Sequence, residues 1–197
     1  MISAKMIKQF FFMVLLLTAS ANVWAQSAEP DISPDRKQAI DSLALEKVRD
    51  LSKYITIIGD KKTRDVEANA AIERAVELFD ADAQIDVSSL NTQKTKAYGV
   101  KDYLKRLKLL NYDQVNIEWF HIQYISDLVK QADGRYVGVI TIYQRFEGKR
   151  KDGMKYVDTT KKDITVYVER KKTTIQGRTI GFWDVMLGDI RVTNTYK

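Results

Sequence analysis

The chain has 197 residues, with 32 basic and 26 acidic side chains and a formal charge of +6, an excess too small and too mixed in sign for a dedicated nucleic-acid binder. It has no cysteine and one histidine, which excludes thiolate catalysis, iron–sulfur clusters, cysteine zinc sites and multi-histidine metal sites. We therefore expect neither a metal nor a cofactor. A hydrophobic content of 45% indicates a folded domain.

The first 25 residues have the layout of a secretory signal peptide. Lys5 and Lys8 precede an apolar stretch over residues 10–17, and a small residue, Ala25, stands at the expected cleavage point. The apolar stretch is too short to span a bilayer comfortably. We expect a mature chain that begins at Gln26, exported to the periplasm or secreted, with a charge of +4 and no membrane span.

The first half of the mature chain is predicted to be mainly helical. After a short disordered lead over residues 26–33, Ser33 and Pro34 make a good helix start, and Gly59 ends the helix. The apolar face of this helix is predicted to hold Ile40, Leu43, Ala44, Val48, Leu51, Ile55 and Ile58. Helices are also predicted over about 66–79 and over 100–110, with a short strand at 83–88 and a polar loop at 91–97 between them.

The second half changes to aromatic and β-branched residues, which favour strands. Strands are predicted over 115–128, 136–146, 163–170 and 181–193, with Asp-Gly turns at 133–134 and 152–153. Helices followed by an antiparallel meander predict an α+β fold, with three helices packed on one face of a curved sheet. We expect residues 34–197 to form a single domain.

This element order resembles the NTF2-like superfamily, a cone-shaped α+β fold. The passage from Glu77 to Val87 resembles the helix-to-strand passage of ketosteroid isomerases and their SnoaL-like relatives, where a Leu-Phe helix end leads to an Asp-Ala pair and the first strand. The segment from Trp183 to Val192 is similar to the closing strands of exported NTF2-like proteins in Bacteroidota. The resemblance implies the fold, a pocket between sheet and helices, and a homodimer formed through the open face of the sheet.

The same resemblance argues against isomerase activity. In those enzymes the general-base aspartate lies four residues after the alanine of the Asp-Ala pair, and here that position is Val87. Asp86 is one residue early, and one step along a strand turns a side chain to the opposite face. Asp82 is then most simply a turn residue.

Candidate site residues lie on the strands. If the strand is regular, His121 shares a face with Trp119 and Gln123, either as a general base in an aromatic pocket or as a histidine hydrogen-bonded in the sheet. Asp189 alternates with Trp183 and could be a semi-buried pocket acid or a salt-bridge partner. Strand aromatics could line a ligand cavity or simply pack in the core: Trp119, Tyr143, Tyr167 and Trp183.

Three basic clusters, at 149–151, 161–162 and 170–172, are predicted to fall at strand ends or hairpin loops. They could form a patch for anionic glycans or lipids, or be solvated tips that protect strand edges.

The leading interpretation is a non-catalytic exported domain that binds a small molecule or a periplasmic protein. The second is an isomerase- or dehydratase-like enzyme that uses His121 and Asp189. The third is a module that binds anionic surfaces through the basic clusters. A homodimer is also predicted, because strand 115–128 carries large apolar groups on both faces, among them Phe120 and Ile122, and strand 181–193 behaves similarly.

Overall fold

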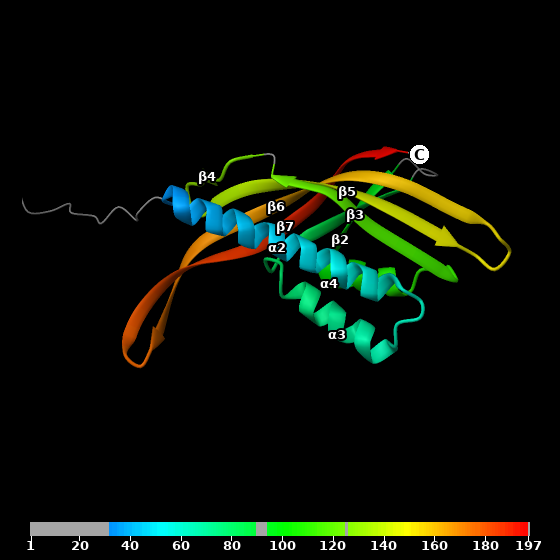
Figure 1. Ribbon diagram of the computed structural model, residues 1–197, viewed down its shortest axis with the longest axis horizontal. Coiled ribbons are helices and arrows are strands. Elements are labelled where there is room, and N and C mark those ends of the chain that lie inside the picture. The colour runs from blue at the N-terminus through cyan, green and yellow to red at the C-terminus, as the bar shows by residue number, and fades with distance from the viewer. Residues whose placement is uncertain (1–31, 90–93, 125, 197) are drawn as a thin grey trace, which may run out of the picture. The chain divides into compact units, whose positions relative to one another are not determined.

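The computed structural model describes residues 32–89, 94–124 and 126–196. The predicted signal peptide and most of the predicted lead lie outside the described residues. All elements described below belong to one compact unit, Pro34–Lys197 (Figure 1). Its helices are α2 (Pro34–Gly59), α3 (Asp65–Val76) and α4 (Val100–Lys108). Its strands are β1 (Gln84–Ser89), β2 (Lys94–Gly99), β3 (Gln114–Tyr124), β4 (Val129–Lys130), β5 (Tyr136–Lys149), β6 (Lys155–Ile175) and β7 (Arg178–Tyr196).

The predicted α+β class is confirmed, since the described residues form three helices and a mixed sheet. The strand order is β2-β1-β7-β6-β5-β3, with β4 beside β5, and the β1–β7 pair is parallel while the others are antiparallel. The helix α2 packs on β3 and β7, and α3 packs on α2 and α4. The covered face of the sheet supplies much of the core: Ile117, Trp119, Ile140, Ile142, Ile164, Val166, Val168, Val185, Leu187 and Ile190. No helix in the described ranges has the length and apolar character to cross a membrane.

The first helix follows its prediction closely. It starts at Pro34 and ends at Gly59, and its buried residues recur at the three- and four-residue spacing of one helix face. Leu43, predicted on this face, is instead 39% exposed, because it lies at the margin of the stripe.

The segment predicted as a polar loop at 91–97 contains a strand in its described part. Lys94–Gly99 pairs antiparallel with β1, with Lys96 opposite Val87. Five of its six residues are exposed at the sheet edge, so the strand is held by backbone pairing and has no apolar alternation for a sequence pattern to detect.

Two bulges overturn the predicted strand faces. In β3 the register shifts between Phe120 and Gln123, where His121 has a φ of 50°. Gln123 pairs with Thr141 and so lies on the face of Phe120, not with Trp119 as predicted, because the extra residue of a bulge reverses the alternation beyond it. Ile125 lies outside the described residues.

In β7 the register shifts between the pairs Val166–Leu187 and Ile164–Ile190. Ile190 is therefore buried on the helix-covered face, although regular alternation had placed it opposite Leu187. Asp189 falls within this irregular stretch, so its predicted alternation with Trp183 and Leu187 is wrong.

The placement of one basic cluster was also wrong. Lys161 and Lys162 lie in the middle of the 21-residue strand β6, and Lys162 is only 3% exposed. The polar residues at 155–162 hid the first part of this strand from the sequence pattern. The cluster at 149–151 does lie at the β5–β6 turn, and residues 170–172 lie in β6, where it pairs with β7 alone in a projecting ribbon (Figure 1).

Candidate functional site

The five residues predicted to bind ligand are spread over different parts of the sheet. Trp119 is buried and its indole Nε1 donates to Gln144 Oε1 at 3.1 Å. Tyr143 stacks on Phe120 with ring centroids 5.7 Å apart. Trp183 packs edge-on against Tyr136, also at 5.7 Å.

The two predicted catalytic candidates do not meet in a cavity. His121 is exposed in the β3 bulge, where its ring contacts those of Phe120 and Tyr143. Asp189 accepts hydrogen bonds from the backbone N–H of Gln84 and from Arg191, both at 2.8 Å. None of the five predicted residues lines the cavity described next, and their role in ligand binding stays a prediction.

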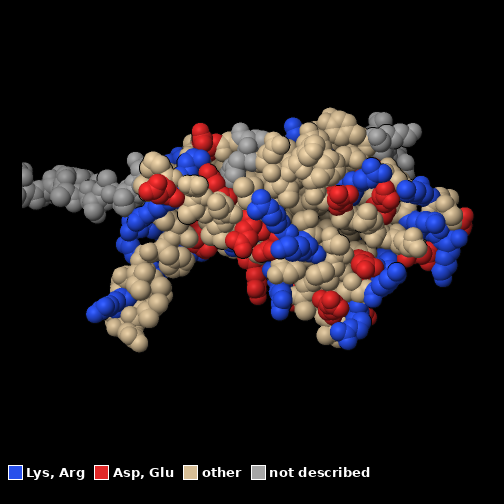
Figure 2. All heavy atoms as spheres, viewed as in Figure 1, with Lys and Arg blue, Asp and Glu red and all other residues tan. Residues whose placement is uncertain are grey.

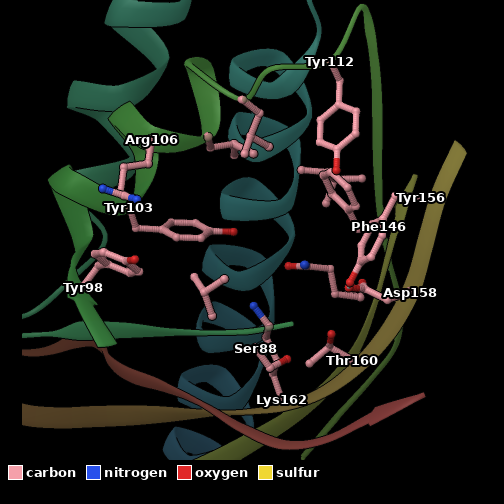
Figure 3. A pocket seen from close by; sticks show the side chains of 15 residues that line it. Ser88, Tyr98, Tyr103, Arg106, Tyr112, Phe146, Tyr156, Asp158, Thr160 and Lys162 are labelled. Carbon is pink, nitrogen blue, oxygen red and sulfur yellow. The ribbon is translucent and has the colours of Figure 1, made fainter. Parts of the chain in front are cut away.

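A cavity of about 320 Å³ lies between α4, the β1–β2 hairpin and strands β5 and β6 of the sheet (Figure 3). Its size falls within the range of small-molecule sites. Aromatic and aliphatic side chains form most of the wall, and polar groups gather on the strands beneath α4. The lining residues are Val87, Ser88, Tyr98, Tyr103, Arg106, Leu107, Leu110, Tyr112, Ile117, Gln144, Phe146, Tyr156, Asp158, Thr160 and Lys162.

The helical wall follows from the spacing of apolar residues in α4. Val100, Tyr103, Leu104 and Leu107 are buried at intervals of three and four residues, so one face of the short helix turns inward. Of these, Tyr103 and Leu107 line the cavity. Figure 3 shows the Tyr103 ring reaching from the helix into the open space.

The opposite wall is an aromatic cluster. Phe146 packs against Tyr112 and Tyr156, with centroid distances of 5.7 and 6.0 Å. Gly148 makes room for it, because a Cβ at that position would stand 2.7 Å from the Tyr112 ring.

The polar floor comes from alternate residues of β6. Asp158, Thr160 and Lys162 face the helices because side chains two residues apart share a face of a strand. They lie on the same buried face of β6 as Ile164 and Val166, at positions where core residues are normally apolar. The sequence signal for this site was the two-residue alternation that continues from Ile164 back to Asp158. It was missed because residues 155–162 were not predicted to be a strand.

Lys162 is the most unusual group of the floor. Its Nζ donates to the backbone carbonyl of Asp86 over a long 3.4 Å and lies 5.8 Å from the centre of the Tyr103 ring. Within the described ranges no carboxylate lies at ion-pair distance from the Lys162 amine. The side chain of Asp86 binds Arg191 instead, at 3.1 Å. Burial lowers the pKa of Lys162 to about 8, and the charges of Asp158 and Asp86 only partly oppose that effect.

Two acids of the cavity are also shifted by burial. The pKa of Tyr103 is raised to about 12, by burial first and then by the charge of Asp158. Burial raises the pKa of Asp158 as well, although the Tyr156 hydroxyl donates to its Oδ2 at 2.7 Å. Both shifts favour the protonated, neutral forms of Tyr103 and Asp158, because burial disfavours a negative charge on either group.

Comparisons with known proteins leave the family open. No family model matches the chain, and no curated protein does. A solved structure from Novosphingobium aromaticivorans, a provisionally named scytalone dehydratase, is similar with 12% sequence identity and a TM-score of 0.42, over 82% of this chain and 90% of that one. A TM-score below 0.5 at this identity assigns neither a fold family nor an activity to this chain.

The burial of Lys162 predicts an unusual pH dependence of stability. Between about pH 8 and 10 the unfolded chain keeps a proton on this lysine that the folded chain has lost, so the free energy of unfolding should rise with pH. The rise should reach about 2–3 kcal/mol, at about 1.4 kcal/mol for each pH unit. Above about pH 10 the raised pKa of Tyr103 works in the opposite direction, because the unfolded tyrosine ionises first.

Urea unfolding followed by tryptophan fluorescence at several pH values measures this effect. Lys162→Met should be more stable than wild type at pH 7 and should lose the rise. Lys161→Met, the neighbouring lysine on the other face of the strand, is the matched control and should keep it. Parallel curves for wild type and Lys162→Met would show that the amine is not buried as described.

Proposed function

We propose that this chain is an NTF2-like domain that binds a small molecule with an aromatic or apolar body in the cavity beneath α4. The observation that carries the proposal is an aromatic-walled space of about 320 Å³ with a few polar groups on one side. The NTF2-like assignment is supported by helices that precede an antiparallel meander and by the passage from Glu77 to Val87.

The position of Asp86 supports a binding role over isomerase chemistry. Val87 lines the cavity, at the place where the isomerases carry their base, while the Asp86 carboxylate is bound by Arg191 outside the lining. An aspartate held in this way is not placed to take a proton from a molecule in the cavity.

An enzyme remains the second candidate, now with different residues. Lys162 and Asp158 have pKa values moved by burial and share one cavity, which is a feature of many active sites. An isomerase or dehydratase built on this fold would use these groups in place of His121 and Asp189. Turnover of a cavity ligand that is lost in Asp158→Asn while binding is kept would favour this candidate.

The anionic-surface hypothesis has less support. Figure 2 shows acidic and basic side chains intermixed on the face in view. At the turn between β5 and β6, Arg150 lies 3.9 Å from Asp152 and Lys151 lies 3.8 Å from Asp113. Exposed pairs of this kind dilute a basic patch.

The binding proposal is tested with N-phenyl-1-naphthylamine, a neutral apolar dye that fluoresces in dry sites. Wild-type protein should enhance its fluorescence. Val87→Trp should weaken the dye's affinity roughly ten-fold or more, because Val87 lines the cavity and a larger indole there would take up space that the dye needs. Val66→Trp, the same substitution on exposed α3, is the control, and circular dichroism checks that both variants fold. Equal dye binding by the two variants would place the dye elsewhere and defeat the proposal.

We also propose that the protein is exported and cleaved after Ala25. The support is the basic, apolar and small-residue order of the first 25 residues. N-terminal sequencing of protein recovered from its native host should begin at Gln26. Met1 retained on exported material would contradict this proposal.

A homodimer through the uncovered face of the sheet is proposed as well. The bulges move Ile190 and Val192 to the helix side, which removes part of the sequence argument, but large apolar groups remain half-buried on the open face: Phe120, Val137, Val139, Tyr143, Tyr167 and Met186. Partly exposed apolar groups on one face of a sheet are typical of an interface, here between two copies of this chain.

Analytical ultracentrifugation tests the dimer. Wild-type protein should sediment as a dimer at concentrations of tens of micromolar, roughly where a standard-sized interface holds. Phe120→Lys should give a folded monomer, because a lysine charge would be buried in the interface. Val66→Lys on exposed α3 should behave as wild type. A monomeric wild-type chain at these concentrations would rule out the interface.

A further inference from the structure

Among the described residues, the floor of the cavity has more hydrogen-bond donors than acceptors to receive them. Lys162 has three N–H donors, and the described residues use one of them, in the long bond to the carbonyl of Asp86. Gln144 accepts from Trp119 through Oε1, so its amide nitrogen is left to donate into the cavity. The hydroxyls of Tyr103 and Thr160 also line this space and have no hydrogen-bond partner within the described ranges.

These donors belong to one small region. On the covered face of the sheet Thr160 pairs with Gln144 and Lys162 pairs with Ile142, so Lys162 and Gln144 are diagonal neighbours. Tyr103 comes down from α4 and places its ring 5.8 Å from the amine. Figure 3 shows Lys162, Thr160 and Tyr103 directed toward the same space.

The two nearest carboxylates are already engaged. Asp86 binds the Arg191 guanidinium through Oδ1 and the backbone N–H of Val192 through Oδ2. Asp158 accepts the Tyr156 hydroxyl through Oδ2. Neither makes an ion pair with Lys162. A buried ammonium without an ion pair is costly, and the cost is recovered when an anion supplies the missing charge and acceptors.

The rest of the cavity restricts what can carry that anion. Beyond the floor, most of the wall is aromatic or aliphatic, with the rings of Tyr112, Phe146 and Tyr156 and the side chains of Leu107 and Leu110 among its members. Arg106 of α4 also lines the cavity, and its guanidinium lies 4.6 Å from the centre of the Tyr98 ring. These surfaces suit a flat or apolar body. The space of about 320 Å³ suits a small organic molecule better than a polymer.

We propose that the cavity binds small organic acids, with the ligand carboxylate on Lys162 and the floor donors and an aromatic or apolar body against the ring cluster. This inference rests on the proposed binding function and names its ligand class. A carboxylate fits the site because its two oxygens accept several hydrogen bonds at once and its charge pairs with the amine.

The experiment compares two probes of nearly the same shape, 2-naphthoate and its uncharged analogue 2-naphthamide, by isothermal titration calorimetry at pH 7. Wild-type protein should bind the naphthoate roughly ten- to hundred-fold more tightly, the ratio expected for hydrogen bonds to a charged partner. Lys162→Met should lose this preference, and the matched Lys161→Met variant should keep it. The wild-type comparison needs no variant, so it holds even where Lys162→Met folds poorly.

The outcomes separate this inference from the function beneath it. Equal affinity for the two probes, or a preference that survives in Lys162→Met, overturns the organic-acid inference. So does wild-type protein that ignores naphthoate while N-phenyl-1-naphthylamine still binds in the cavity, a result that leaves the binding function standing. If the neutral dye fails too, the proposed function falls and the inference falls with it.

Discussion

The junction between β1 and β7 attaches the β1–β2 side of the cavity to the rest of the sheet. The two strands are parallel, and their ladder has a single register pair, Ile85 with Ile190, beside an isolated parallel bridge between Phe79 and Leu187. A short parallel pairing is weak on its own. Arg191 strengthens it by binding Asp86 of β1 at 3.1 Å and Asp189 of β7 at 2.8 Å, while Asp189 also accepts the backbone N–H of Gln84. The β1–β2 hairpin leads directly into α4, so this junction holds two walls of the cavity in place.

Asp86 connects that junction to the floor. Its carboxylate accepts a hydrogen bond from Arg191, and its backbone carbonyl accepts one from the Lys162 amine. The negative charge that could neutralise Lys162 is therefore used to attach the hairpin to the sheet. Asp86 thus helps attach the hairpin to the sheet, and its carboxylate is not available to form an ion pair with Lys162.

The buried Lys162 amine in the floor lowers the stability of the fold. A methionine-sized apolar side chain in place of Lys162 would avoid the cost of a buried charge, and unpaired buried charges are among the strongest destabilising features of a core. A chain selected for stability alone would continue the apolar line of Ile164 and Val166 through position 162. The amine at position 162, together with Asp158 and Thr160, lowers local stability, and the proposed ligand contacts would account for that cost.

Sequence patterns predicted the elements better than the site. The first helix, the α+β class and the long strands follow from three- to four-residue and two-residue periodicities, which are local properties of the chain. The edge strand at 94–99 was missed because backbone pairing, not an apolar pattern, holds it. The floor was missed because the polar residues at 155–162 look like loop until the sheet places alternate members under α4. The position of Lys162 is a tertiary fact, set by what packs above the strand.

The two bulges explain why the residues predicted to be catalytic differ from the residues that line the cavity. Both catalytic candidates were chosen by counting alternate residues along strands, His121 from Trp119 and Asp189 from Leu187. In each case the candidate is one of two residues that stand opposite a single residue of the neighbouring strand, so the count fails at the residue of interest. On β6 the pairing with β5 is continuous from Lys155 to Val168, and there the same two-residue count correctly carries the inward face from Val166 through Ile164 to Lys162, Thr160 and Asp158. Alternation is therefore reliable for locating this site only within an unbroken register, and the uninterrupted β5–β6 ladder is the physical reason that its polar floor forms a single connected surface.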